Sequence, residues 1–482
     1  MVTIRSAVLF GLAHLCHLQA VRAVSPQEIV KDLEHLLSRG SEVVLASDAA
    51  YAEDFTARFS ESHSPSYVVG AKPQNAKDVQ KLVKYASRHN VPFLATGGGH
   101  GYSWSLGTLQ NGIHVDLDNF QTIEIDEGAN TMTIGGAVRI GNATRDLHAV
   151  GKEFRPLGGI YGTGSDNLLS AEVVTGTGEI LTVSEKKHPD LFYGLRGAGF
   201  NYGIVTSLTY RIHPATNNGE VTVIDATFPA ALNGSVWEAA HSLVGHQPKE
   251  LSILFAIRFN ETLGGMSLVG SFIFFGPEAQ AVEAAKPFLD LNPLNVEVKT
   301  STYDEFSHVA LYGEVADIGP KKSINFAPLT INLYQVDVAN MIKVINFMNQ
   351  TLTENADLKA ATLSWAQYPL DGFLKYPLES SAFPYRDVVV YFSYDGFAET
   401  TDQLPIMEDL GKEVRALLQQ GSGKPDLQTY VLFSHGDEGP EAWYTSDKLP
   451  RLKQLKRKYD PKNLFSWYNP VPNKGHRGAD SD

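Results

Sequence analysis

Three consecutive glycines followed by a histidine form the stretch of this chain best suited to chemistry, Gly97-Gly98-Gly99-His100-Gly101. Because glycine carries no side chain, the backbone N–H groups of such a stretch can converge on an anion at close range. The imidazole of His100 adds a nucleophile directly beside them. The stretch therefore predicts a cofactor held by its phosphates and tethered covalently, although the same residues are also typical of an ordinary tight loop.

The segments on either side of the glycines, residues 91–95 and 113–117, have the composition of short strands. We therefore expect the glycines in a turn between two strands of one sheet layer. A backbone cradle held in such a layer would be rigid, which favours the cofactor interpretation over the ordinary loop.

Motifs of other enzyme classes are absent from the sequence. It contains no HExxH, no paired histidines at helical spacing beyond residue 23 and no cysteine beyond that point, so we predict no metal site. It contains no GxSxG elbow, which argues against a serine hydrolase. Residues 197–203, Gly-Ala-Gly-Phe-Asn-Tyr-Gly, lack the GxGxxG spacing of a dinucleotide fold, which disfavours an NAD-dependent dehydrogenase.

Length and charge set the class of protein. A chain of 482 residues exceeds one ordinary hydrophobic core, so we expect two or more domains. It carries 40 Lys and Arg against 54 Asp and Glu, a net charge of −14. Such a surface repels polyphosphate and anionic headgroups, so nucleic acids and membrane surfaces are not expected as partners.

The first 23 residues have the pattern of a secretory signal. Arg5 precedes a short apolar stretch, residues 7–18, and small residues suited to cleavage follow. The apolar stretch is too short to span a membrane. Because Cys16 is the only cysteine, the mature chain would carry no thiol. We expect a secreted protein with N-glycans at some of four Asn-x-Ser/Thr triplets, which begin at Asn142, Asn233, Asn260 and Asn349.

The chain divides into zones of different patterning, which together predict an α+β fold. Residues 25–215 alternate short strands with helices. Residues 216–427 contain longer alternating strands with helices between them, which indicates an antiparallel sheet with helices on one side. A tail rich in aromatic residues spans 428–472, and residues 473–482 have the composition of a disordered end.

Three blocks of sequence together carry a family resemblance. The first comprises residues 67–70, 91–103 and 112–117, and the second runs from 165 to 206. The third is the tail, with Tyr459-Asp460-Pro461-Lys462-Asn463-Leu464-Phe465. In this order and over nearly the whole chain, the blocks resemble the FAD-linked oxidoreductases of the vanillyl-alcohol-oxidase superfamily with a PCMH-type domain, specifically the fungal berberine-bridge-enzyme-like group.

The resemblance implies a domain organisation and a cofactor. A two-lobed PCMH-type FAD-binding domain would occupy residues 25–215, and a substrate domain with an antiparallel sheet flanked by helices would be inserted at 216–427. The tail, 428–472, would return to the FAD-binding domain. FAD would lie extended between the two lobes.

The resemblance also implies roles for particular residues. The family histidine matched by His100 bonds covalently to the flavin, which raises the redox potential and prevents cofactor loss. The glycines of the same stretch would hold the pyrophosphate through their amides. The remaining matched cofactor residues are Gly203, Ile204 and Val205 on the adenine side, and Asn463 near the cofactor.

Two departures from the family pattern concern flavin binding. Many members carry a second flavin tether, a cysteine, within a glycine-rich segment that follows a Gly-Lys-Glu-Phe sequence. Here residues 151–154 run almost directly into 155–162, so the cysteine and most of that segment are missing. Either a coding segment is absent from the sequence or flavin binding is weakened. Leu432 also stands where relatives usually have Asn.

The resemblance predicts an FAD-dependent oxidase. A C–H next to a hydroxyl or amine would deliver hydride to flavin N5, a protein base would take the proton, and O2 would be reduced to hydrogen peroxide. The candidate bases are Tyr430, Tyr444 and Tyr385, each of which also suits a hydrogen-bonded core position. The substrate would be a secondary-metabolite intermediate, or else a sugar or simple alcohol. The shortened segment leaves an alternative open, a glycoprotein that keeps the fold and binds ligand without turnover.

Overall fold

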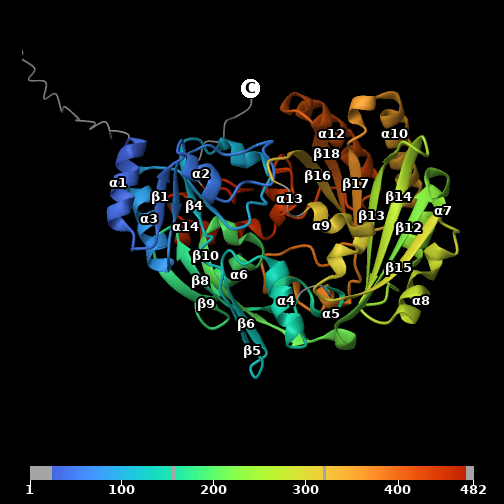
Figure 1. Ribbon diagram of the computed structural model, residues 1–482, viewed down its shortest axis with the longest axis horizontal. Coiled ribbons are helices and arrows are strands. Elements are labelled where there is room, and N and C mark those ends of the chain that lie inside the picture. The colour runs from blue at the N-terminus through green and yellow to red at the C-terminus, as the bar shows by residue number, and fades with distance from the viewer. Residues whose placement is uncertain (1–23, 155–157, 319–321, 474–482) are drawn as a thin grey trace, which may run out of the picture.

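The computed structural model describes residues 24–154, 158–318 and 322–473. The predicted signal segment 1–23 and nearly all of the predicted disordered end lie outside these residues. The described chain forms two small sheets on one side and one large sheet on the other, each accompanied by helices (Figure 1). The predicted α+β class is confirmed. Among the described helices, none combines the length and apolar character needed to cross a membrane.

The first small sheet has the strand order β1-β2-β4-β3. Strands β2, β4 and β3 run parallel, and the edge strand β1 pairs antiparallel with β2. Helices α1 and α3 pack against this sheet. Their buried apolar residues, such as Leu33 and Leu82, share one hydrophobic core with its strands. The elements are α1 (Pro26–Leu36), β1 (Glu42–Leu45), α2 (Ala49–Asp54), β2 (Tyr67–Lys72), α3 (Ala76–His89), β3 (Phe93–Thr96) and β4 (Gly112–Asp116).

The connection that carries the glycine stretch differs from the predicted turn. Strands β3 and β4 are parallel neighbours, with Phe93 opposite Ile113 and Thr96 opposite Asp116. Parallel strands cannot be joined by a tight turn, because the chain must return to the same end of the sheet. Residues 97–111 therefore form a crossover that includes a 3₁₀ helix, Trp104–Thr108.

The second small sheet is antiparallel, with the order β5-β6-β10-β8-β9. The hairpin predicted around residues 175–178 is present between β8 and β9. The short α5 begins at Gly158, directly after a gap of three residues in the described chain. The elements are β5 (Ile123–Asp126), β6 (Thr131–Gly135), α4 (Ile140–Ala149), α5 (Gly158–Tyr161), β8 (Leu168–Thr175), β9 (Ile180–Ser184), α6 (Pro189–Ala198) and β10 (Gly203–Arg211); β7 (Lys152–Glu153) and β11 (His213–Pro214) pair separately.

The large sheet is antiparallel throughout, with the order β15-β12-β14-β13-β17-β18-β16. Its strands are β12 (Glu220–Pro229), β13 (Leu251–Asn260), β14 (Gly265–Phe274), β15 (Asn295–Thr302), β16 (Asn325–Leu333), β17 (Thr362–Gln367) and β18 (Val390–Ala398). Four helices cover one face, α7 (Asn233–Ser242), α8 (Glu278–Leu289), α10 (Val338–Glu354) and α12 (Leu404–Gln420). The other face is turned toward the small sheets, with α9 (Glu314–Ile318) between them (Figure 1).

A buried ion pair joins the large sheet to the second small sheet. The guanidinium of Arg386, which precedes β18, donates two hydrogen bonds to the carboxylate of Asp166, at 2.5 and 2.8 Å. The side chains are 5% and 0% exposed. The planar guanidinium matches the two carboxylate oxygens, so the pair fixes the orientation of the two parts as well as their distance.

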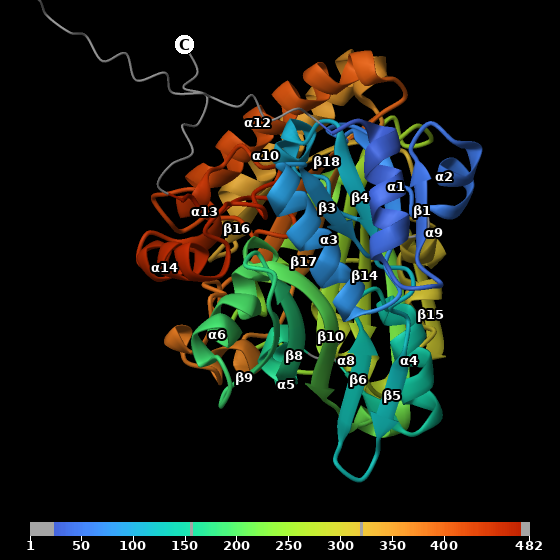
Figure 2. The ribbon, with the colours of Figure 1, turned by 90° about the vertical axis from the view of Figure 1, so that its left-hand side faces the viewer.

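The tail returns to the small sheets through two helices, α13 (Pro440–Tyr444) and α14 (Leu449–Tyr459), which lie beside α6 (Figure 2). Leu452 and Leu455 of α14 are buried with Leu191 and Phe192 of α6. The amphipathic spacing of α14 thus brings the end of the chain back to residues more than 200 positions earlier.

The tail motif after α14 is a buried clamp. The Asp460 carboxylate accepts hydrogen bonds from the amides of Leu464 and Phe465, at 2.8 and 2.9 Å. The Lys456 ammonium pairs with Asp460 at 2.8 Å and also donates to the carbonyl oxygens of Asn201 and Phe465. Both ionised side chains are fully buried, so each depends on the other for compensation of its charge.

We expect Asp460→Ala to lower the free energy of unfolding by about 3–5 kcal/mol, because it leaves the Lys456 ammonium buried without its counter-ion. Lys458→Met removes an exposed pair with Asp190 and should change stability by less than about 1 kcal/mol. Urea unfolding followed by circular dichroism measures both. Equal stabilities of the two variants would contradict the clamp.

Candidate functional site

Three adjoining cavities lie where the small sheets, the large-sheet part of the chain and the tail meet. The inner cavity, of about 490 Å³, is lined by residues that include Gly136, Gly197, Gly203, Ile204, Val205 and Leu432. The sheet cavity, of about 680 Å³, is lined by residues that include Tyr102, Thr330, Ser364, Asp395, Phe397 and Phe433. The side cavity, of about 370 Å³, is lined by residues that include Gly162, Tyr303, Phe306, Phe373 and Tyr391.

The inner cavity contains three of the residues that sequence analysis assigned to the cofactor, Gly203, Ile204 and Val205. They begin β10, which pairs with β8 at this point. A Cβ on Gly203 would lie 2.4 Å from the carbonyl oxygen of Val174. Only glycine therefore allows the two strands to approach this closely at the cavity wall.

The glycine stretch leaves the end of β3 as an open loop. Gly99 has a φ of +71°, and a Cβ there would lie 2.6 Å from the carbonyl oxygen of Ala57. Within the described chain, the amides of Gly97, Gly98, Gly99 and Gly101 donate to no acceptor. A row of uncommitted N–H groups on backbone that excludes side chains suits an anion.

Positive charge gathers around the same loop. The Lys322 ammonium donates to the carbonyl oxygen of Gly98 at 2.5 Å, and the Arg58 guanidinium donates to that of Gly101. Burial lowers the pKa of Lys322, and the nearby Arg139 and Arg58 lower it further. The mutual repulsion of these cations would be relieved by a dianionic group, so the residues fit the pyrophosphate of FAD.

His100 directly follows the three glycines and lines none of the three cavities. Its imidazole is exposed and meets the ring of Phe59 edge-on, with 6.1 Å between the ring centres. Phe59 lines the sheet cavity. The position is compatible with a bond to the ring of a cofactor whose phosphates occupy the loop, and the covalent bond itself stays a prediction.

Strand β18 supplies the chemistry of the sheet cavity. Its alternate residues, Tyr391, Ser393, Asp395 and Phe397, line the cavity. Val390 and Tyr394, which alternate with them, belong to the core beneath the helices. The period of two in a strand thus separates a polar wall from an apolar core along a single segment.

Asp395 is a half-buried carboxylate in the wall of the sheet cavity. It accepts hydrogen bonds from the hydroxyls of Ser364, at 2.5 Å, and Ser393, at 2.6 Å. No ion pair among the described residues includes it. Burial raises its pKa. A desolvated acid in a cavity is a candidate general base that sequence analysis missed; the available signal was an acidic residue within an apolar alternating strand.

Of the three predicted tyrosines, Tyr430 lies where the cavities meet. It lines all three of them, and Phe433 lines both the sheet cavity and the side cavity. The ring of Tyr430 packs against those of Phe383 and Tyr391, with 5.7 and 5.8 Å between centres. Tyr430 therefore separates the cavity with the predicted cofactor residues from the cavity with the buried carboxylate.

Tyr444 and Tyr385 occupy structural positions instead. The Tyr444 hydroxyl donates to the carbonyl oxygen of Asn469 at 2.6 Å and accepts from the amide of Asn201 at 3.0 Å. The Tyr385 hydroxyl donates to the carbonyl oxygen of Ala442. Both rings are buried, and neither lines one of the three cavities. Their geometry gives them no access to a ligand there.

Asn463 and Leu432, both singled out from the tail, are placed differently. Asn463 has a φ of +58° and donates its amide to the carbonyl oxygen of Asp460, so it makes the turn of the tail clamp. It lines none of the three cavities. Leu432 lines the inner cavity, as its place in the family pattern implied.

The residues on either side of the undescribed 155–157 lie at the walls of the inner and side cavities. Phe154, the last residue before the undescribed 155–157, lines both. Its amide donates to the Tyr303 hydroxyl at 2.9 Å, and that hydroxyl donates back to its carbonyl oxygen. The large-sheet part of the chain thus fixes the backbone where the glycine-rich segment of relatives would begin.

The predicted glycosylation sites differ in exposure. Asn142 is exposed, whereas Asn233 is only 4% exposed and accepts a hydrogen bond from the Trp237 indole. Asn349 accepts from the amide of Met266, and Asn260 from the amide of Leu263. The buried position of Asn233 leaves no room for a glycan in the folded protein.

Two segments of the chain match known protein families. Residues 67–160 match the family described as FAD binding domain, and residues 429–472 match the family described as berberine and berberine like. The first segment contains the glycine loop with His100, and the second contains Tyr430 and the tail clamp.

Characterised sequences resemble the chain over almost its whole length. It is 33% identical over 464 residues to FAD-linked oxidoreductase tazL of Aspergillus terreus. The aligned region covers 90% of this chain and 92% of that protein. It is 32% identical over 480 residues to FAD-linked oxidoreductase azaL of Aspergillus niger. This second aligned region covers 93% of this chain and 100% of that protein.

Solved structures share the fold. Xylooligosaccharide oxidase from Myceliophthora thermophila C1, in complex with xylobiose, matches with a TM-score of 0.79 and 20% identity over 94% of this chain and 100% of that one. Wild-type BBE-like 1 of Physcomitrella patens matches with a TM-score of 0.80 and 19% identity, also over 94% of this chain and 100% of that one. The arrangement of sheets around the cavities is therefore common to these proteins.

We expect Gly99→Ala to lower the FAD content of the purified protein, because its methyl group would displace the loop from Ala57. Gly245→Ala is the matched control, since Gly245 also has a positive φ, +76°, but has open space around it. Both variants carry backbone strain of about 1 kcal/mol. The ratio of flavin to protein absorbance measures the difference, and equal ratios would contradict the cradle.

Proposed function

This chain belongs to the FAD-linked oxidoreductases of the berberine-bridge-enzyme-like family, and we propose that it oxidises a small organic molecule at a C–H next to a hydroxyl or amine, with O2 as electron acceptor. The observation that carries this proposal is the position of Asp395 in a cavity that meets the inner cavity at Tyr430. A substrate bound in the sheet cavity would then have the proton acceptor Asp395 on one side and the cofactor on the other.

The residues that would hold FAD are the glycine loop, His100 and the Gly203–Val205 wall. When bound, FAD supplies the hydride acceptor and afterwards the reductant for O2. For an alcohol substrate, two electrons and two protons leave to give a carbonyl compound, and O2 gains both to give hydrogen peroxide. Asp395 takes the hydroxyl proton, and the second proton leaves with the hydride.

Ser364 and Ser393 prepare Asp395 for this role. Both hydroxyls donate to the carboxylate oxygens, which holds its plane fixed beneath the substrate. Burial raises the pKa of Asp395, so the ionised carboxylate is a stronger base than an exposed one. Tyr430 closes the other side and can orient the substrate hydroxyl through its own.

The walls of the sheet cavity favour an aromatic or largely apolar substrate. Phe326, Phe397 and Phe433 line it together with Tyr102. A volume of about 680 Å³ accommodates a molecule of drug size. We therefore propose a polyketide-like or similar secondary-metabolite alcohol. Sugars remain the second candidate, since aromatic rings also stack on sugars and the fold is shared with a xylooligosaccharide oxidase.

We also propose that the protein is secreted and carries an N-glycan at Asn142. The composition of residues 1–23 supports secretion, and the exposure of Asn142 supports modification there. Treatment of the protein from culture medium with a glycosidase, followed by peptide mass mapping, tests both statements.

We expect Asp395→Asn to lower kcat/KM by about 10²–10⁴-fold. In the unchanged enzyme, kcat/KM should rise with pH as Asp395 ionises, through a pKa above its ordinary 3.8, and this acidic limb should be absent from the variant. Hydrogen peroxide formation with a panel of aromatic alcohols and oligosaccharides gives the rates. Tyr444→Phe is the control, because its hydroxyl is structural. An acidic limb that persists in Asp395→Asn would exclude Asp395 as the base.

We expect the flavin of the unchanged protein to stay bound after acid precipitation, because His100 holds it covalently. His100→Ala should bind flavin that the same treatment releases, and the exposed His308→Ala should behave like the unchanged protein. Flavin fluorescence in the supernatant measures release. A folded but colourless unchanged protein would favour the alternative without turnover.

A further inference from the structure

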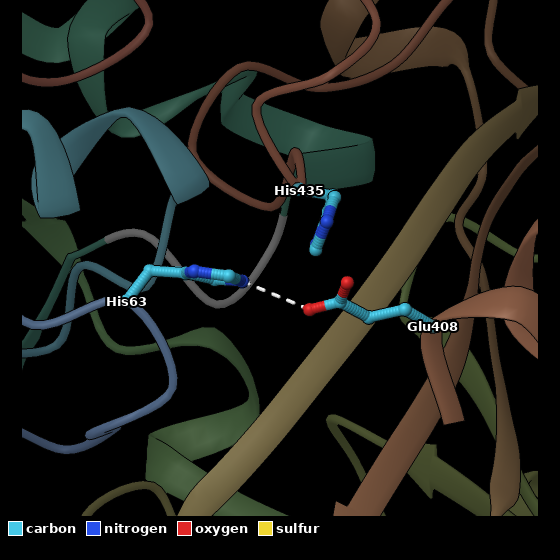
Figure 3. Close-up of side chains that lie close together, drawn as sticks. All are labelled: His63, Glu408 and His435. Atoms are coloured by element: carbon cyan, nitrogen blue, oxygen red, sulfur yellow. Dashed lines mark hydrogen bonds and ion pairs between the residues drawn. The ribbon is translucent and has the colours of Figure 1, made fainter. Parts of the chain in front are cut away.

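The tertiary structure brings together three side chains of metal-ligating type that sequence analysis did not single out. His63 precedes β2, Glu408 lies on α12 and His435 lies in the tail. One ligand atom from each lies within 4.8 Å of the other two. Figure 3 shows the two imidazoles and the carboxylate turned toward one another.

The spacing is close to that of a coordination shell. His63 Nε2 and Glu408 Oε1 are 2.9 Å apart, and the two imidazole rings are nearly perpendicular with 5.8 Å between centres. Ligand atoms at about 2.0–2.1 Å from a tetrahedral Zn²⁺ lie about 3.3 Å from one another. The separations in the cluster, 2.9 Å for the first pair and at most 4.8 Å for any pair, bracket that value.

His435 has an unused ligand atom. The residue is only 3% exposed, and its Nδ1 is buried without a hydrogen-bond partner among the described residues. A buried polar atom normally has a partner, because leaving it unpaired costs about 1–3 kcal/mol. Coordination of a metal ion through this Nδ1 would remove the cost.

The backbone around His435 is fixed before any ion binds. Its carbonyl oxygen accepts from the amide of Trp104 at 2.7 Å, and its amide donates to Glu438 at 3.0 Å. Glu438 in turn accepts from the indole of Trp443 and pairs with Arg415. Ligands held in this way lose little freedom on binding, which favours affinity.

We propose that His63, Glu408 and His435 bind one divalent transition-metal ion, Zn²⁺, with water as the fourth ligand. Two imidazole nitrogens and one carboxylate suit Zn²⁺, whereas Ca²⁺ and Mg²⁺ prefer oxygen ligands alone. The three ligands come from the first lobe, the large-sheet part and the tail. The ion therefore joins three parts of the chain at one point.

The site is separate from the proposed catalytic chemistry. None of the three ligands lines the inner, sheet or side cavity. His435 follows Phe433, which lines the sheet cavity, by two residues. The ion would thus hold the tail segment with Tyr430 and Phe433 against the large sheet, and its role is positional.

The test uses the full chain, produced without a polyhistidine tag and freed of metal by a chelator. Calorimetric titration with zinc chloride, checked by elemental analysis after gel filtration, should give one Zn²⁺ per chain, and zinc should raise the melting temperature. His63→Ala, Glu408→Gln and His435→Asn should each weaken zinc binding by roughly 100-fold or more. His308→Ala, which removes an exposed imidazole 3.9 Å from Glu305, should bind zinc normally.

Circular dichroism shows which variants are folded, and the stoichiometry of the unchanged protein decides the question without any variant. Failure of that protein to bind zinc would overturn the proposal. Zinc binding that survives in all three folded variants would also overturn it, because the ion would then lie elsewhere. Neither result depends on the presence of flavin or on turnover.

Discussion

The buried pair between Asp166 and Arg386 is the contact on which the arrangement of the cavities depends. It joins the second small sheet to the segment that leads into β18, with both side chains almost completely buried. Gly164 and Ser165 beside Asp166 line the inner cavity, and β18 lines the sheet cavity. Because two parallel hydrogen bonds fix angle as well as distance, the inner cavity and the sheet cavity keep one relative position.

That position explains how strand β18 can contribute both to the hydrophobic core and to the polar wall of the sheet cavity. The apolar residues of β18 join the core beneath α10 and α12, while its polar residues face the space between the sheets. The large sheet can leave one face free of its own helices only because the small sheets and the tail cover it. Asp395 faces this covered space, and burial raises its pKa.

The tail contributes in two ways that have different physical origins. Its end is held by charge, through the fully buried Lys456 and Asp460. Its beginning places Tyr430 and Phe433 in the cavity walls and His435 beside His63 and Glu408. The end of the tail is thus ordered by a buried ion pair, and its beginning is ordered by packing of Tyr430 against Phe383 and Tyr391.

The sequence by itself determined the features that depend on local pattern: the glycine loop beside His100, the hairpin at 175–178, the alternating strands of the large sheet and the tail motif around Asp460. Glycine tolerance, strand periodicity and turn chemistry act over a few residues, so they can be recognised from the sequence. Tertiary structure alone decided that β3 and β4 are parallel, that Tyr430 faces the cavities while Tyr444 and Tyr385 are structural, and that Asp395 is the enclosed acid. It also decided that His63 meets Glu408 and His435 across more than 300 residues. Such neighbours are fixed by how whole sheets pack, and no local spacing encodes them.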